Sequence, residues 1–291
     1  MHPTLGIGLA LVSALSWAFG STLYKRLGED VPAVGLNLIT SVLGLLLLLA
    51  VVATSGGPNL PGSAPWLLAC SGIVGITVGD TLFFRALRDL DAHAVVVLSM
   101  LAPVLTIGLA VVWLGEQPRP QAWTGIALVL CGVGAVLSTQ LAGAATGRKR
   151  RGVGFGLGAV VAMAAGTVVA KQGLTGVSAL DATCVRVGAG TLGLVAVALV
   201  RGGLGVQLAP CLRPQVLPRL LLGVAVVTLG GFWALHASLQ AVDLAVAASL
   251  HATEPLFVLP IAAFWLGERV TPRAIVGASA SVAGVVVLYA A

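Results

Sequence analysis

Charged residues are scarce in this chain. Asp, Glu, Lys and Arg together make up 9% of the sequence, whereas a soluble globular domain carries about 25%. Aromatic residues are also few, at 5%, while hydrophobic residues reach 58% and the mean hydropathy is +1.05. This composition excludes a soluble globular protein. It leaves room for roughly ten membrane spans of about 20 apolar residues each.

Several motifs of soluble enzymes and binding proteins are also absent. The chain has no P-loop, dinucleotide-binding fingerprint or nucleophile motif. Its four cysteines lack metal-ligand spacing, and Cys70, Cys131 and Cys184 fall in apolar segments, where cysteine acts as a small hydrophobic residue. The net charge of +6 does not indicate nucleic-acid binding, because the basic residues lie in short loops. We expect no cofactor, no metal and no nucleic-acid partner.

The main feature that is present is an internal duplication. Residues 101–116 and 253–268 share a proline near the start and the ending Trp-Leu-Gly-Glu, and this register of about 152 residues continues on both sides. Nearer the start of each repeat the offset between equivalent residues is about 146, as in the pairs Gly20 with Gly166 and Lys25 with Lys171. Duplicated hydrophobic chains are typical of transporters, in which two repeats surround a central site.

The hydrophobic segments define the expected topology. Segment 5–24 has no basic region before it, so we expect a retained span and not a signal peptide. The repeats are predicted over 1–141 and 153–291, with five spans each and a basic linker at 142–152. An odd number of spans per repeat inverts the second repeat relative to the first. We expect spans near 4–24, 32–54, 65–87, 92–114, 120–141, 153–173, 178–200, 217–239, 244–266 and 271–290.

The basic residues are distributed unevenly between the two sides of this topology. The connections after the odd-numbered spans hold thirteen Lys and Arg residues, and the other side holds two, Arg119 and Lys171. By the positive-inside rule, this bias places both termini outside the cell.

The duplicated motif resembles a known family. Pro103 with Leu-Gly-Glu116, and Pro255 with Leu-Gly-Glu268, resemble the EamA repeat of the drug/metabolite transporter superfamily. The opening segment from Trp17 to Lys25 is similar to the first span of that family. Arg186 matches an arginine of the second span, although the first repeat has Thr40 at the equivalent position.

The resemblance implies an all-α integral membrane protein of the bacterial inner membrane, with ten transmembrane helices as two inverted five-helix repeats around a central cavity. It implies an exporter of small metabolites. Our own first expectation is a monomeric carrier of amino acids in the lipid bilayer that works by alternating access, driven either by proton coupling at Glu254 or by the substrate's own gradient. The resemblance also implies that both termini lie in the cytosol, whereas the distribution of Lys and Arg places them outside the cell. The residues alone are also compatible with two other functional classes: a membrane enzyme acting on lipid-linked substrates, and a passive channel.

Glu254 is the first candidate site residue. It lies near the middle of the ninth expected span, where a charge is costly and is usually functional. The first repeat has Ala102 at the equivalent position. His251 is on the same helical face, and Pro255 and Pro103 are expected to kink their helices toward a midplane pocket. Glu254 either binds a proton or a cationic substrate group, or forms a structural hydrogen bond.

Asp80 and Arg186 are the other charged candidates within spans. Asp80 is expected either to face the cavity or to pair with Arg85 at a helix end. Arg186 is expected either to hold an anionic substrate group through its guanidinium fork or to brace the helix by pairing with Asp181 or a carbonyl group.

The remaining candidates have weaker signals. Glu116 and Glu268 end equivalent spans, so we expect a shared structural or gating role, such as capping a neighbouring helix. Trp17 is expected either to stack on a planar substrate or to pack, and His236 is expected to pack. Lys25 and Lys171 are expected to extend toward water from helix ends. His251, Glu254 and His236 would be the only candidates for a metal site, and they do not form a convincing one.

Overall fold

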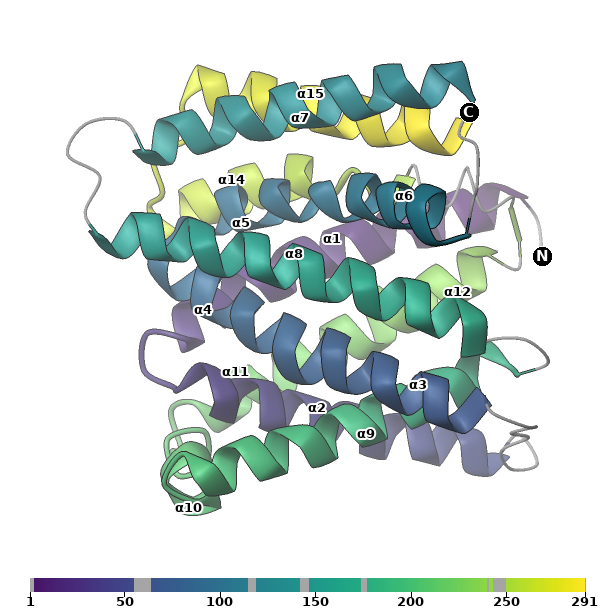
Figure 1. Cartoon of the computed structure of the whole chain (residues 1–291). Helices are drawn as coiled ribbons and strands as arrows, with labels where there is room; N and C mark the ends of the chain where they lie inside the picture. The colour runs from purple at the N-terminus through teal and green to yellow at the C-terminus, as the bar shows by residue number, and fades with distance from the viewer. Residues whose placement is uncertain are drawn as a thin grey trace.

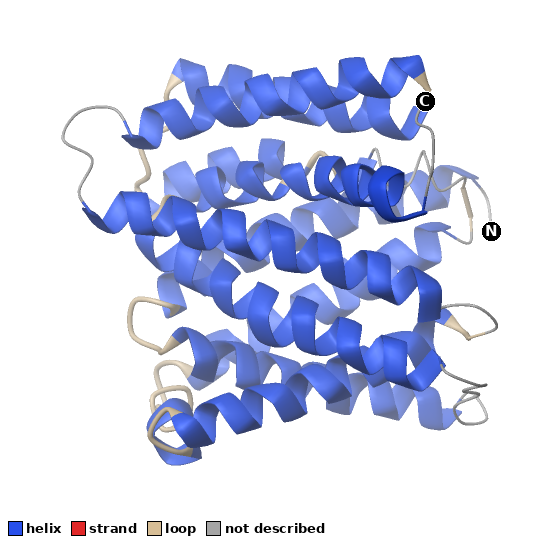
Figure 2. Cartoon of the chain, in the orientation of Figure 1, coloured by secondary structure: helices blue, strands red, loops and turns tan. Residues whose placement is uncertain are grey.

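The computed structural model describes residues 3–54, 64–114, 119–141, 147–173, 177–239, 241–242 and 250–290. Within these ranges the chain forms helices joined by short connections (Figure 2). Helices are the expected solution for an apolar chain, because a lipid environment offers no hydrogen-bond partner to backbone groups.

The helices of the first half cross the molecule back and forth, and some crossings comprise several consecutive helices (Figure 1). They are α1 (Pro3–Leu27), α2 (Ala33–Thr54), α3 (Ala64–Gly72), the π-helix η1 (Ile73–Asp80), α4 (Thr81–Asp89), α5 (Ala92–Ser99), α6 (Leu101–Leu114) and α7 (Pro120–Leu141).

The second half follows the same order. It comprises α8 (Gly147–Gly173), α9 (Ala179–Val200), the short α10 (Leu204–Leu208), α11 (Leu217–Ala225), the π-helix η2 (Val226–Trp233), α12 (Ala234–Leu239), α14 (Glu254–Leu266) and α15 (Pro272–Ala290).

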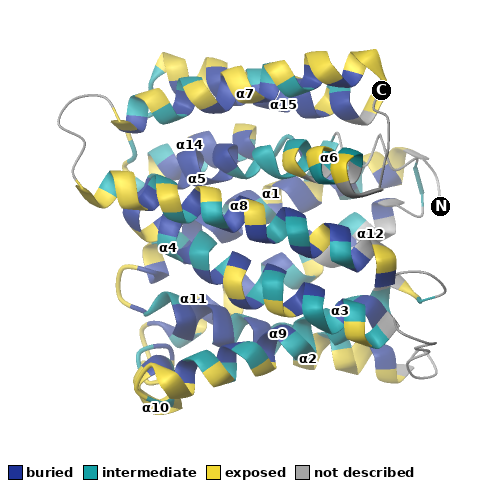
Figure 3. Cartoon of the chain, in the orientation of Figure 1, coloured by how far each residue is buried: buried dark blue, intermediate teal, exposed yellow. Residues whose placement is uncertain are grey.

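Seven helical segments are long and apolar enough to cross a membrane, and three shorter apolar helices accompany them: Leu217–Gly231, Glu254–Leu266 and Pro272–Leu288. The outer faces are strongly apolar. Phe264 is 93% exposed and Val112 is 86% exposed, and exposed positions run along the outward sides of the helices (Figure 3). Such surfaces are suited to lipid, so the protein is an all-helical, multi-pass membrane protein.

The same two irregularities occur in both halves. The π-helix η1 covers residues 73–80 and η2 covers residues 226–233, which agrees with the repeat register to within one residue. A second break separates α5 from α6 at Met100, and the equivalent turn, Ala252–Thr253, precedes α14. Each break lies just before a repeated proline, Pro103 or Pro255, which cannot donate the backbone hydrogen bond that would continue the helix.

The final helices of the two halves, α7 and α15, pack closely against each other through glycine (Figure 1). A Cβ atom on Gly125 would lie 2.7 Å from the carbonyl oxygen of Gly284, and one on Gly284 would lie 2.7 Å from that of Gly125. Gly132 and Gly277 contact each other in the same reciprocal way. The helices are therefore antiparallel, and only residues without a side chain permit this backbone approach.

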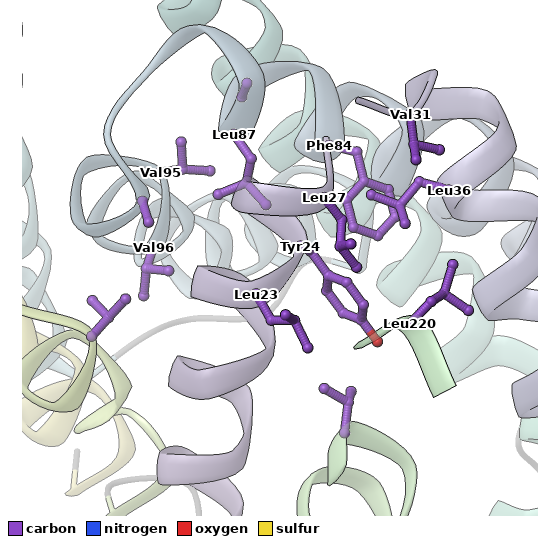
Figure 4. Close-up of a cluster of buried hydrophobic side chains, with 14 of the residues drawn as sticks. Leu23, Tyr24, Leu27, Val31, Leu36, Phe84, Leu87, Val95, Val96 and Leu220 are labelled. Atoms are coloured by element: carbon purple, nitrogen blue, oxygen red, sulfur yellow. The ribbon is translucent and has the colours of Figure 1, made fainter. Parts of the chain in front are cut away.

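One apolar cluster fixes α1, α4, α5 and α11 near one end of the molecule (Figure 4). Tyr24 of α1 meets Phe84 of α4 edge to face, with ring centroids 5.5 Å apart. Leu23, Leu36, Leu87 and Leu220 are almost completely buried around them. This packing holds the C-terminal end of α1 against the connection between α4 and α5.

The basic segment expected to form a linker is partly helical. Helix α8 begins at Gly147, so Arg148 to Arg151 form its first turns. Arginine has good helix propensity, and Asp89 at the end of α4 pairs with two of these arginines. The segment expected to be a linker is thus helical from Gly147 onward, and residues 142–146 lie outside the described residues.

Candidate functional site

Glu254 lies where α14 begins after the break in the ninth span. Its side chain is half-buried, and Ser21 of α1 donates a hydrogen bond to its Oε1 atom at 3.2 Å. The Ser21 hydroxyl also reaches the carbonyl oxygen of Trp17 at 2.9 Å. A charged Glu254 can accept the serine proton, while a protonated Glu254 can donate to the serine oxygen. The site therefore accommodates both forms of the carboxyl group.

His251 lies three residues before Glu254 and is also half-buried. Its Nδ1 atom is 3.2 Å from the Ser13 hydroxyl, which donates to the carbonyl oxygen of Gly231 at 2.8 Å. A hydroxyl has one proton, so the Ser13 oxygen is left to accept a hydrogen bond from Nδ1. This pattern suits a neutral imidazole that carries its proton on Nδ1.

Helix α1 places three of these groups on one face, because Ser13, Trp17 and Ser21 are spaced four residues apart. The facing helix η2 offers Gly230 and Gly231. A Cβ atom on Gly231 would lie 3.0 Å from the Trp17 indole nitrogen, and one on Gly230 would overlap the Ser16 hydroxyl. The glycines thus bring η2 close enough for its backbone to bond to α1.

Asp80 and Arg186 form a second polar group, at the end of η1 and on α9. The opposite charges of the two side chains attract each other. In the described part of the chain, Nε of Arg186 is buried without a hydrogen-bond partner. Gly75 of η1 lies beside this side chain, since a Cβ atom there would be in van der Waals contact with Nη2 of Arg186 at 3.6 Å.

The two partners considered from sequence, Arg85 and Asp181, have other contacts in the structure. Arg85 lies over the ring of Phe155, at 5.5 Å from its centroid, and not beside Asp80. Asp181 is bonded to Ser178 at the start of α9, with the Ser178 hydroxyl 2.8 Å from Oδ2.

Neighbouring helices hold η1 in place. Asn37 of α2 donates to the Ile76 carbonyl oxygen at 2.9 Å and to the Thr81 hydroxyl at 3.0 Å. Thr77 donates to the Gly190 carbonyl oxygen of α9 at 2.9 Å. These bonds satisfy polar groups at a stretch where the regular α-helical pattern is lost, and they fix the backbone that carries Asp80.

Glu268 joins four elements at one end of the molecule. Its Oε1 atom accepts a hydrogen bond from the backbone N–H of Ala92 at 2.6 Å, at the start of α5, and its Oε2 atom is 2.7 Å from Nδ1 of His93. Lys25 lies 3.9 Å from Oε1 and donates to the carbonyl oxygens of Leu87 and Leu90. Glu268 and Lys25 thus satisfy the open ends of α5 and α4.

The Lys25 side chain is only 14% exposed. The expectation that it extends toward water is therefore wrong, and the free carbonyl groups at the end of α4 explain the difference. A pocket of about 600 Å³ lies beside this cluster, lined by Lys25, Glu29, Asp91, Trp265 and Glu268 among others.

Several predicted residues lie outside the described part of the structure. They are Glu116 and the side chains of His236 and Lys171. Among the described residues, His, Cys, Asp and Glu do not form a group of three that could hold a metal ion.

The candidate residues predicted from the sequence do not include Ser13, Ser21, Asn37 or His93. The two serines carried a usable signal, because they share the helical face of Trp17 in an apolar span. The role of His93 was not visible, since it depends on a partner 175 residues away.

Comparison with known proteins places these features in a family. The model of the EamA-like transporter family matches residues 4–138 and again residues 150–290. An "Uncharacterized transporter in cobO 3'region" from Sinorhizobium sp. is 33% identical over 128 residues, which cover 42% of this chain and 86% of that protein. A solved structure described as "Crystal structure of protein" is 16% identical, with a TM-score of 0.66 over 99% of this chain and 96% of its own.

The structural match shows a shared fold, and the family model covers most of the chain in two copies. The protein is therefore a multi-pass membrane transporter, not an enzyme, and it belongs to the EamA-like transporter family of the drug/metabolite transporter superfamily.

Proposed function

We propose that this protein is a secondary transporter that exports a small metabolite, an amino acid in the first instance, by alternating access. The observation that carries the proposal is the half-buried carboxyl of Glu254, bonded to Ser21 at a helix break inside an apolar bundle. An ionisable group at such a position is usually part of a substrate or proton pathway.

In this proposal the chain crosses the membrane ten times, as two inverted five-helix repeats. The reciprocal glycine contacts of α7 and α15 support inversion, because a twofold axis in the membrane plane makes equivalent helices antiparallel. A second pair of contacts agrees: Gly20 lies against Val227, and the equivalent Gly166 lies against Gly75. The three shorter apolar helices account for the remaining crossings.

The two polar groups suggest the substrate class. A guanidinium fork such as that of Arg186 binds a carboxylate through two hydrogen bonds, and its buried Nε has no partner among the described residues. Glu254 can bind an ammonium group or a proton. A central cavity between them would suit a zwitterionic amino acid, with the carboxylate toward Arg186 and the amine toward Glu254.

The Lys25–Glu268 cluster would act as one of two gates. It ties α1, α4 and α5 of the first half to the end of α14 of the second half, so it closes one end of the space between the halves. The repeat register assigns Lys171 and Glu116 to the opposite gate. Rocking one repeat against the other would break one gate as the other forms.

Transport into proteoliposomes tests the proposal. A thermal-shift screen against metabolites identifies a ligand, which raises the melting temperature by binding the folded state. Its uptake should saturate and respond to a pH gradient. In Glu254→Gln, the pH dependence should disappear while the protein still folds. The control variant Glu29→Gln removes an exposed carboxyl group and should keep the pH dependence of uptake. An unchanged pH profile in Glu254→Gln excludes Glu254 as the coupling residue, and flux that never saturates indicates a channel.

A further inference from the structure

A second pocket, of about 450 Å³, lies where the end of α4 meets the start of α8. It is lined by Arg85, Arg88, Asp89, Arg148, Arg151 and Phe155. Four guanidinium groups and one carboxylate give it a formal charge of +3. The helices that form it are candidate membrane spans ending at Asp89 and beginning at Gly147, so the pocket lies at a membrane–water boundary.

Asp89 holds two of the arginines in defined positions. Its side chain is 4% exposed, and it accepts hydrogen bonds from Arg148 Nε at 3.2 Å and from Arg151 Nε at 2.8 Å. Arg148 also donates to the carbonyl oxygen of Arg88 at 2.5 Å. Arg148 and Arg151 nevertheless remain 59% and 60% exposed, so donor atoms of both are still available to a ligand.

The pocket continues from these exposed arginines toward the bilayer. Arg85 lies one turn before Arg88 on α4, over the ring of Phe155. On α8 an exposed stripe begins at Arg151 and continues through Gly154, Leu157 and Val161. Leu157 is 43% exposed and Val161 55%, and a Cβ atom on Gly154 would meet nothing within 4 Å. A cationic pocket thus leads directly into an open apolar strip.

We propose that this pocket binds the phosphate group of an anionic phospholipid, with an acyl chain along the α8 stripe. Guanidinium groups match phosphate oxygens through paired hydrogen bonds, and basic pockets between membrane helices bind anionic headgroups. A soluble phosphate would satisfy the arginines equally well, but it would leave the apolar strip without a role. The site does not depend on the transport proposal, because it uses none of the transport residues.

Lipid retention on the detergent-solubilised protein tests this site, because the micelle removes the membrane surface and its diffuse attraction. Native mass spectrometry with added phosphatidylglycerol should show one lipid bound per chain, and phosphatidylcholine with the same acyl chains should bind at least tenfold more weakly. Arg85→Gln with Arg88→Gln should reduce phosphatidylglycerol binding at least tenfold, without breaking the Asp89 pairs. The control double variant Lys149→Gln with Arg150→Gln removes the same charge outside this pocket and should stay within twofold.

Equal losses in the two double variants, or equal binding of the two lipids, would overturn the proposal. Glycerol 3-phosphate added at the same concentration should not displace the lipid, and efficient displacement would reassign the site to a soluble phosphate. If the double variant does not fold, the single variants Arg88→Gln and Arg150→Gln, both at exposed positions, provide the same comparison.

Discussion

The two halves of this protein share a backbone scaffold but not its polar groups. Trp17 packs against Gly231, and at the equivalent positions Met163 packs against Gly79, with the same closest distance of 3.0 Å from a Cβ atom placed on the glycine. The polar residues around Glu254 are different at the equivalent positions of the other half. Ser13 corresponds to Ala159 and Ser21 to Thr167, while His251 corresponds to Ser99 and Glu254 to Ala102. The scaffold contacts are duplicated, whereas the carboxyl and imidazole groups occur once.

The second polar group, formed by Asp80 and Arg186, also has no counterpart in the other half. Asp80 corresponds to Phe232, and Arg186 corresponds to Thr40. Small residues that permit close helix packing are retained in both copies because each copy must form the same contacts. A substrate between two inverted repeats has no such symmetry, so its partners can differ. The difference between the halves is therefore the best guide to the transport site.

The largest effect is expected where α7 and α15 approach each other through their backbones. In Gly132→Ala, the new methyl group would meet the Gly277 carbonyl oxygen and Ser281, and backbone atoms cannot move away easily. We expect the free energy of unfolding to fall by about 3 kcal/mol, seen as lower yield and a lower melting temperature. Gly134→Ala, two residues away with nothing within 4 Å, should be neutral. Similar stability of the two variants would contradict the packing described here.

Moving the carboxyl group between halves tests whether its surroundings matter. The double variant Glu254→Ala with Ala102→Glu keeps one carboxyl at an equivalent helix position. We expect transport to stay at least about 100-fold below the wild type, because Ser99 replaces His251 in the new surroundings and the removal of a key electrostatic group typically has this effect. Initial uptake rates in proteoliposomes measure it. Restored uptake would show that transport does not require the carboxyl group to be in the second repeat.

Arg186 tests the proposed contact with a substrate carboxylate. Arg186→Lys keeps the positive charge but loses the planar fork, so we expect the KM of an anionic or zwitterionic substrate to rise about tenfold. The kcat should change little, because binding and not the conformational cycle is weakened. Concentration-dependent uptake separates the two constants. An unchanged KM would leave Arg186 with a structural role only.

The smallest effect is expected at Glu268, where a substitution tests how much the Lys25–Glu268 cluster contributes to stability. Glu268→Gln keeps an acceptor for the Ala92 N–H but loses the charge that faces His93 and Lys25. We expect a loss of about 1 kcal/mol in stability, measured by thermal unfolding in detergent. Glu29→Gln, which removes an exposed carboxyl beside the same pocket, should have no measurable effect. Equal behaviour of the two variants would show that the cluster contributes nothing.

The sequence predicted the helical class, the duplication and the interruptions near Pro103 and Pro255, because hydropathy and repeated residues report these directly. It did not predict the π-helices, since Ile73–Asp80 and Val226–Trp233 have no distinctive spacing. The partners of Asp80, Arg186 and Lys25 also depended on which distant helices meet. The partners of buried polar groups are decided by how distant helices pack, and a single sequence carries little information on that packing.

The central claim is that the two repeats cross the membrane in opposite directions, with the unduplicated polar groups between them. Gln121 and Arg273 are equivalent exposed positions at the starts of α7 and α15. In a variant whose four cysteines are replaced by alanine, Gln121→Cys and Arg273→Cys can each be labelled in sealed vesicles with a membrane-impermeant maleimide. The inverted arrangement predicts that one cysteine reacts from outside and the other only after the vesicles are opened. Labelling of both from the same side would contradict it.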